Sequence, residues 1–391
     1  MAADASHDNQ QVIHIGAAIS LSGTFATSGR YVRDGYEFAV ETINARGGIL
    51  VNGEHREIVL TYRDDRSEAG EATTIVENMV RQEGVRFLLG PYSTQLAQAV
   101  EPIAERYKLP MLEAGAAGSS LFERGYRYLF GVLTTTEHYM DDVFVVAAEK
   151  AAPKLGKPAS EIRVGLAVRD DRFSRDLRDE VLSEIRKHDM RLVIDDRLPQ
   201  DPTDMSMTLD RVKRLEPDIM VISGHEEAAL AALDHLHRQR IAVPMLAVTH
   251  CHPANIIKAK PGFSEGVFCP MQWHPSVPYR DDVFGSAHDY AEKFSRRYGY
   301  PPPNQAAQAS AAILVYLRAI EKCDSLDPDK VRETLAALET ETFYGPIDFD
   351  DGGRNIAKPM LLMQVINGEY VMLAPNKFGR AEPVIQLRPA R

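Results

Sequence analysis

Hydroxyl and glycine residues that could bind an anion follow the first apolar run of the chain. The run covers residues 12–19, and the small-residue loop Ser20 to Gly29 follows it. Apolar residues then recur at 3- and 4-residue spacing, namely Val32, Tyr36, Ala39, Val40 and Ile43. This pattern predicts a strand, a loop and a helix. Such a loop offers hydroxyls and backbone N–H groups to a ligand at the carboxyl end of a strand. An ordinary connection of turn-forming residues is the alternative.

A second cluster, His250-Cys251-His252 with His225, has the residue types of a metal site. Adjacent ligands in one loop rarely converge on one tetrahedral ion, and no second ligand pair supports them. We therefore expect a polar hinge loop and no metal. The sequence also lacks GxGxxG, GxxxxGK[ST], HExxH and GxSxG motifs. We expect neither enzymatic activity nor a cofactor.

The composition excludes several classes of protein. With 391 residues, the chain is long enough for two domains, and its hydrophobic (44%) and charged (26%) fractions are those of a globular protein. No apolar run approaches the ~20 residues of a membrane helix. The net charge of −11, without a basic stripe, argues against nucleic acid as a partner. Three widely spaced cysteines, Cys251, Cys269 and Cys323, permit at most one disulfide bridge.

Two successive sets of alternating strands and helices are expected. Four strand-then-helix alternations in the first ~130 residues indicate a doubly wound parallel sheet. A second set begins near Arg163, and the strands at 360–366 and 370–373 close the chain. The fold class expected is therefore α/β, with two doubly wound parallel-sheet lobes.

Several stretches of the chain, taken together, resemble one family. They are SLSGTFATSG, INARGGI, FLLGPYSTQLAQAVEPIAERYKLPMLEAG, VGLAVRDDRFSRDLRDEV, PDIMVISG and YGPIDFDDGGRN. In this order they resemble the leucine/isoleucine/valine-type periplasmic binding proteins, the solute receptors of ABC importers. The resemblance implies the type I periplasmic binding protein fold, with two lobes joined by a three-segment hinge. It also implies an ABC permease as partner, and we expect a monomer.

The resemblance also suggests where the lobes divide. Residues 12–131 and 256–340 would form the first lobe, and residues 132–255 and 341–391 the second. The hinge crossings would lie near 130–134, 249–255 and 341–345. The first eleven residues are polar and lack a signal-peptide apolar region. Either the protein is cytoplasmic or a signal peptide has been removed; the resemblance favours removal and a periplasmic location.

In the resembled family, two loops of the first lobe hold the carboxylate of the ligand. Here these loops match Tyr92-Ser93-Thr94 and Gly115-Ala116-Ala117, with Phe25 and Ser28 in the first loop. Backbone donors at helix N-termini suit an anion. Ser93 and Thr94 could equally cap the following helix, and both roles are compatible.

The chain departs from the family where amino-acid binders hold an ammonium group. Ala117 stands where those proteins have threonine, and Thr249 or His250 stands where they have an acidic residue. A buried ammonium without its counter-charge would cost ~3 kcal/mol or more. A carboxylate without an ammonium group is therefore favoured. Three acidic residues could substitute and keep an amino acid open as the ligand: Glu113, Asp171 and Glu226.

Aromatic residues on the loops that the family uses suggest a flat ligand. Phe173 matches a position over the ligand, and His225 matches a frequent tyrosine. Phe173 could line an aromatic cleft together with Phe25, Tyr92 and Trp273. Each of these residues, taken singly, is more often part of a core. His225 and His250 could meet a ring hydroxyl or, if protonated near pKa ~6.5, a second carboxylate.

The function expected is capture of a small carboxylate, aromatic before aliphatic, and its delivery to an ABC transporter. A branched-chain or other amino acid is the other ligand class. The alternative function is a cytoplasmic or receptor-linked sensor of amides or amino acids with the same fold. An apolar signal segment in the gene would separate the two functions.

Overall fold

The computed structural model describes residues 12–198, 204–251, 262–379 and 381–387, and these form two compact units. Unit 1 extends to Thr135 and includes Trp273–Lys358, whereas unit 2 consists of Thr136–Gln272 and the chain from Pro359 onward. Within the described residues, no helix combines the length and apolarity required to cross a membrane.

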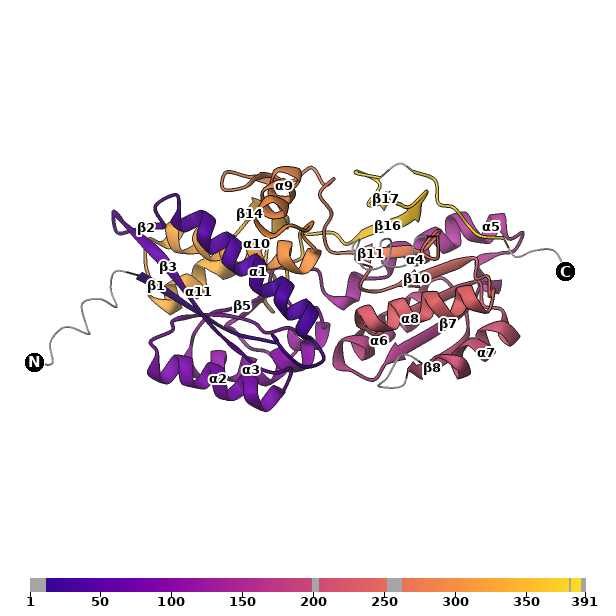
Figure 1. Cartoon of the computed structure of the whole chain (residues 1–391), viewed down its shortest axis with the longest axis horizontal. Helices are drawn as coiled ribbons and strands as arrows, with labels where there is room; N and C mark the ends of the chain where they lie inside the picture. Colours follow the sequence, from indigo (N-terminus) through magenta and orange to yellow (C-terminus); the bar gives the residue numbers. More distant parts are fainter. Residues whose placement is uncertain (1–11, 199–203, 252–261, 380, 388–391) are drawn as a thin grey trace, which may run out of the picture. The chain divides into compact units, whose positions relative to one another are not determined.

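Unit 1 is built on a six-stranded sheet with helices on both faces. Apart from the antiparallel β2–β3 pair, neighbouring strands are parallel. Figure 1 shows α2 and α3 together on one side of the strands, and α1 with α10 on the other. The strands, in sheet order, are β2 (Ile49–Val51), β3 (Glu54–Asp64), β1 (Val12–Ile19), β4 (Phe87–Leu89), β5 (Met111–Glu113) and β6 (Leu129–Gly131). The main helices are α1 (Ala26–Asn44), α2 (Ala69–Gln82), α3 (Thr94–Tyr107), α9 (Ala287–Tyr298), α10 (Asn304–Cys323) and α11 (Pro328–Ala336).

Small residues allow α10 to pack closely against α1 and the sheet. A Cβ atom added to Gly35 of α1 would lie 2.2 Å from the carbonyl oxygen of Ala306, so only glycine allows this approach. On α10, the buried Tyr316 hydroxyl lies 2.7 Å from the carbonyl oxygens of Leu88 and Pro110. This contact ties the helix to β4 and to the residue before β5, which carry the loops of the candidate site.

Unit 2 is built on a seven-stranded sheet in which β8, β7, β9, β10 and β11 are parallel and the two C-terminal strands are antiparallel. Residues of α4 and α6 share one core cluster with the parallel strands. In sheet order the strands are β17 (Glu369–Ala374), β16 (Leu361–Ile366), β11 (Phe268–Met271), β10 (Met245–Val248), β9 (Ile219–Ser223), β7 (Arg163–Arg169) and β8 (Arg191–Leu198). The helices are α4 (Asp141–Val146), α5 (Ala152–Lys154), α6 (Arg172–Lys187), α7 (Ser206–Leu215) and α8 (His225–Arg238).

The expected α/β class with two parallel-sheet lobes is confirmed, but both sheets carry antiparallel strands at one edge. The units also divide at other residues than the expected lobes. β11 pairs with β10 in unit 2, so the second crossing follows Gln272. The third crossing follows Lys358, because Phe343 stacks on Tyr290 inside unit 1 at 3.8 Å between ring centroids. Part of the expected second crossing, residues 252–255, lies outside the described residues.

One disulfide bridge joins Cys251 and Cys269, with their Cα atoms 5.5 Å apart. Cys251 directly follows the candidate-site residues Thr249 and His250, and the bridge links it to Cys269 of β11. Cys323 is a free, half-buried thiol at the end of α10. The bridge closes a loop of 18 residues, and cross-links of this length stabilise chiefly by restricting the unfolded chain.

Replacing both Cys251 and Cys269 by alanine should lower the free energy of unfolding by about 3 kcal/mol, because the loop closure is lost. Denaturant unfolding, followed separately for the two units through inserted fluorescent probes, would locate the loss in unit 2. Cys323→Ala is the matched control and should cost much less. An equal loss in the two proteins would contradict a stabilising role for the bridge.

Candidate functional site

In unit 1, the loops after β1 and β4 come together at the carboxyl edge of the sheet. The rings of Phe25 and Tyr92 pack edge to face, with centroids 5.7 Å apart. Ser20 Oγ lies 2.6 Å from Oδ1 of Asp65 and 3.2 Å from the carbonyl oxygen of Tyr92, so its single hydrogen is directed at groups of two neighbouring loops. Ser28 lies in the first turn of α1, which begins at Ala26, and not in the loop where it was expected.

Ser93 and Thr94 begin α3, but their hydroxyls have different roles. Thr94 Oγ1 accepts the N–H of Gly118 at 3.2 Å and thereby joins the loops that follow β4 and β5. Ser93 precedes the helix in an extended conformation, and its side chain makes no capping hydrogen bond. The first N–H groups of α3 also lack intrahelical partners. Ser93 is therefore the hydroxyl of this pair that a ligand can use.

The loop Gly115-Ala116-Ala117 is occupied by a side chain of the protein itself. Oε1 of Glu113 accepts the N–H of Gly115 at 2.6 Å, and the N–H groups of Ala116 and Ala114 also stabilise the charged carboxylate. We expected these donors to hold the carboxylate of a ligand. The structure corrects this expectation for Gly115 and Ala116, because the carboxyl group of Glu113 already lies at these N–H groups.

Glu113 is fully buried, so it can only reach groups inside unit 1. Desolvation raises its pKa to about 8 in spite of the three backbone donors. A Cβ atom on Gly90 would lie 1.7 Å from Oε2, so a glycine at the end of β4 makes room for the carboxyl group. Tyr36 of α1 lies close to this group: burial raises its pKa, and Glu113 and Tyr316 of α10 raise it further.

In unit 2, Asp171 caps α6 and faces a histidine. It accepts the N–H of Ser174 at 2.8 Å, and its Oδ2 lies 3.3 Å from Nε2 of His225. Burial alone would raise the pKa of Asp171. The interactions with His225 and Ser174 outweigh burial and lower it. Asp171 is thus held as a carboxylate by two neighbours of the same unit.

Two histidines of unit 2 have left-handed backbone conformations. The φ angles are +61° at His225 and +60° at His250, which is uncommon for residues other than glycine and recurs at functional sites. Their rings are 4.8 Å apart, and the ring of Phe173 lies edge-on 5.4 Å from that of His250. The expected group Phe173, His225 and His250 is therefore assembled at the carboxyl ends of β7, β9 and β10.

Of the two roles considered for His250, the one that requires a protonated ring is not favoured. Burial, followed by the nearby His225, lowers the pKa of His250 to about 3, so the ring is neutral at physiological pH. The buried Thr249 lies between this ring and the strands: its Oγ1 is 3.0 Å from Nδ1 of His250 and donates to Ser223 at 3.3 Å. Thr249 therefore positions the histidine from inside unit 2.

Trp273 is also corrected, because it belongs to the core of unit 1. Its side chain is 2% exposed, its indole N–H donates to the carbonyl oxygen of Phe343, and its ring packs edge-on against Tyr290 and Phe343. The cluster with metal-ligand residue types, His250-Cys251-His252 with His225, is used differently: Cys251 forms the disulfide, and His252 lies outside the described residues. No group of three His, Cys, Asp or Glu side chains in the described part of the chain could hold a metal ion.

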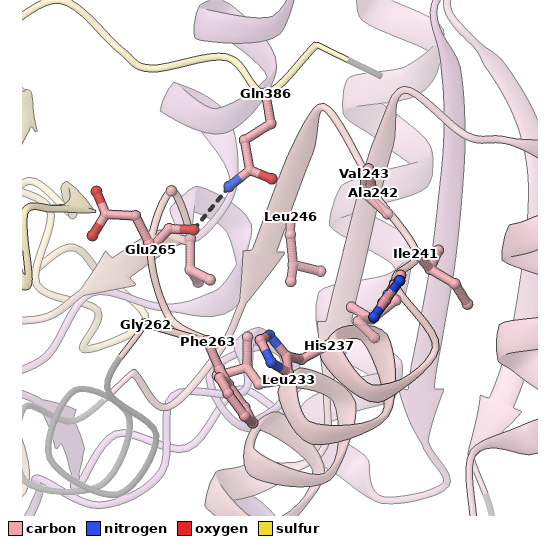
Figure 2. A pocket seen from close by; sticks show the side chains of 14 residues that line it. Leu233, His237, Ile241, Ala242, Val243, Leu246, Gly262, Phe263, Glu265 and Gln386 are labelled. Atoms are coloured by element: carbon pink, nitrogen blue, oxygen red, sulfur yellow. Dashed lines mark hydrogen bonds between the residues drawn. The ribbon is translucent and has the colours of Figure 1, made fainter. Parts of the chain in front are cut away.

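A separate pocket of about 410 Å³ lies at the opposite edge of the unit 2 sheet (Figure 2). It is lined by the C-terminal half of α8 and by the residues that lead into β10 and β11, together with Gln386. In Figure 2 the rings of His237 and Phe263 lie against each other, and Gln386 donates to the carbonyl oxygen of Glu265 at 2.8 Å. The pocket therefore lies at the amino ends of β10 and β11, away from the histidine pair.

Comparison with known proteins relates nearly the whole chain to one family. The sequence profile described as periplasmic binding protein matches residues 12–369. A protein of Brucella suis named Leu/Ile/Val-binding protein homolog 7 is 23% identical over 398 aligned residues, which cover 97% of this chain and 95% of that protein.

Solved structures share the fold at low sequence identity. The branched-chain amino acid transporter substrate-binding protein of Streptococcus pneumoniae, in complex with isoleucine, has a TM-score of 0.79 at 20% identity and covers 92% of this chain and 97% of its own. A solute-binding protein of an ABC transporter from Rhodopseudomonas palustris, in complex with 3,4-dihydroxybenzoic acid, has a TM-score of 0.79 at 16% identity, with 96% and 98% covered.

The buried Glu113 should make folding depend on pH. Its folded pKa of about 8 exceeds the ordinary value of 4.5, so its contribution to stability is complete below pH 4.5 and is lost as the pH rises towards 8. Relative to Glu113→Gln, the natural protein should lose about 1 kcal/mol of unfolding free energy per pH unit over this range. Denaturant titrations at pH 5, 6, 7 and 8 measure the slope. The exposed Glu123→Gln is the control and should retain the natural slope; equal slopes in all three proteins would contradict the assignment.

Proposed function

The chain belongs to the periplasmic binding protein family, and from this premise we propose that it captures a small carboxylate outside the cytoplasm and delivers it to an ABC permease. Its lobes would close around the ligand, because a ligand that contacts both lobes only in the closed form shifts the population towards closure. In this function the protein is a non-catalytic, monomeric receptor located in the periplasm.

The observation that carries the carboxylate part of the proposal is the start of α3. There, Ser93 offers a hydroxyl that caps nothing, beside the N–H groups of Thr94 and Gln95, which precede the first N–H groups that bond to the Ser93 carbonyl oxygen. The helix dipole adds a partial positive charge at this point. An anion bound here would gain several donors without a basic side chain, which suits a carboxylate released later to a permease.

The ligand class that we propose is a carboxylate without an α-ammonium group, aromatic before aliphatic. Ala117, Thr249 and the neutral His250 supply no negative charge where amino-acid binders have acceptors. Phe25, Tyr92 and Phe173 are aromatic residues near the carboxyl ends of their sheets. The 3,4-dihydroxybenzoic acid bound by the Rhodopseudomonas palustris protein supports this class, and the isoleucine bound by the Streptococcus pneumoniae protein supports the amino-acid alternative.

Ser93→Ala should weaken the binding of benzoate and hydroxybenzoates about tenfold, because one hydrogen bond to a charged group is lost. Isothermal titration calorimetry measures the affinity, and thermal unfolding should change little, since Ser93 caps no N–H group. Thr94→Ala is the comparison: it should also lower the melting temperature, because Gly118 loses its acceptor. Unchanged affinity in Ser93→Ala would remove this residue from the site.

A saturating ligand should reduce the radius of gyration measured by small-angle X-ray scattering, since closure makes the particle more compact. Leucine, valine, phenylalanine, benzoate and cinnamate should each be tested at a concentration well above its dissociation constant. A ligand that binds by calorimetry and leaves the radius unchanged would contradict closure around the ligand.

A further inference from the structure

The hydrogen-bond chain behind His250 determines which ring nitrogen carries the proton. Thr249 Oγ1 donates its single hydrogen to Ser223 Oγ at 3.3 Å, so it cannot also donate to His250. This arrangement favours the tautomer in which Nδ1 of His250, 3.0 Å from the same oxygen, carries the hydrogen and donates it to Thr249. Ser223 in turn lies 3.2 Å from Ser174 Oγ, so the chain continues into α6.

The remaining nitrogen of His250 is an acceptor. A neutral imidazole carries one N–H group, and burial keeps this ring neutral. With the proton on Nδ1, Nε2 presents a lone pair. Within the described residues, no side chain or backbone group forms a hydrogen bond with Nε2. His250 as a whole residue keeps some exposure, and its ring lies edge-on to Phe173.

The neighbouring carboxylate does not offer an equivalent acceptor. Oδ1 of Asp171 accepts the N–H of Ser174 at 2.8 Å, and the charged Oδ2 lies 3.3 Å from Nε2 of His225, within ion-pair distance but without hydrogen-bond geometry. Asp171 is thus engaged by its own unit. Nε2 of His250 is, by contrast, an uncharged acceptor next to an aromatic ring.

We propose that Nε2 of His250 accepts a hydrogen bond from a hydroxyl group of the ligand, and that the ligand class is therefore a hydroxylated carboxylic acid. The proposal rests on the proposed function and specifies its ligand. An ammonium group brings a full charge and three N–H donors to one neutral acceptor, and burying it there would be costly. A second carboxylate would place its oxygens against a lone pair. A hydroxyl supplies the single neutral donor that the site requires.

The test compares ligands that differ by one group. Calorimetry with 3- and 4-hydroxybenzoate, benzoate, terephthalate, phenylalanine, leucine and 2-hydroxyisocaproate gives the affinities. At least one hydroxy acid should bind the natural protein ~10-fold or more tightly than the same acid without its hydroxyl, which is the effect expected when a buried acceptor gains or loses its donor.

Two variants test the role of His250 itself. His250→Phe keeps a ring at this position, so it should retain the affinity for the unhydroxylated acid and lose the preference for the hydroxy acid. His237→Phe is the matched control, because His237 lies in the pocket at the other edge of the sheet, and it should keep the preference. Circular dichroism and thermal unfolding verify that each variant folds.

The tautomer provides a readout that a purely structural role would not change. In the natural protein, ¹⁵N NMR of labelled histidine should show His250 neutral with the proton on Nδ1. Thr249→Val removes the oxygen that holds this proton, so the spectrum should shift towards the other tautomer and the hydroxyl preference should fall. A charged ring, or a proton on Nε2 in the natural protein, would overturn the proposal.

The failures of the two proposals are distinguishable. If benzoate and the hydroxybenzoates bind equally, or if terephthalate binds most tightly, the hydroxyl assignment is overturned and the carboxylate receptor stands. If leucine or phenylalanine binds most tightly, the assignment is again overturned, with Asp171 as the ammonium partner. If none of these acids binds, both proposals are overturned.

Discussion

Polar groups at the carboxyl ends of the parallel strands must find hydrogen-bond partners when folding removes them from water. This constraint shapes the candidate site in each unit. An unpaired buried donor or acceptor costs about 1–3 kcal/mol. In unit 1 the chain solves the problem with a carboxyl group of its own, because Glu113 takes the N–H of Gly115. In unit 2 it solves the problem with a hydroxyl relay from His250 through Thr249 to Ser223. What stays unpaired after these assignments is what a ligand can bind.

The same constraint explains how much of the site could be predicted from the sequence. The alternation of apolar runs and helical spacing gave the order of strands and helices, and the loops at the carboxyl ends followed from parallel pairing. Phe173, His225 and His250 could be expected near one another for this reason. The antiparallel edge formed by β2 and β3 was missed because β2 is only three residues long. The second and third crossings between the units could not be predicted either. Which unit a segment belongs to depends on contacts between distant residues, such as that between Phe343 and Tyr290.

The protonation state of His250 and the use of the loop N–H groups by Glu113 could not be predicted from the sequence, for a different reason. The pKa of a histidine depends on its burial and on the charges around it, and the sequence near His250 shows neither. Likewise, the motif Glu113-Ala114-Gly115 does not reveal that the carboxyl group folds back onto its own loop. Gly90 is the one available signal, because a residue without a side chain at the end of β4 leaves room for a buried group. Trp273 was misplaced since its neighbours Tyr290 and Phe343 are distant in the sequence.

The two candidate sites, one in each unit, have opposite hydrogen-bonding chemistry. The start of α3 offers only donors, namely the Ser93 hydroxyl and backbone N–H groups, whereas His250 offers an acceptor. The ligand class that we propose, a hydroxylated carboxylic acid, is likewise an acceptor at one end and a donor at the other. A carboxylate with a distant hydroxyl has this polarity and carries no positive charge that would require Asp171. An α-amino acid places its charged donor next to its carboxylate, so it concentrates both requirements at one end and leaves the distant acceptor facing an aliphatic side chain. Within the proposed function, the separation of donor and acceptor along the ligand, more than its size or aromatic character, is therefore the property that we expect to decide which acids bind.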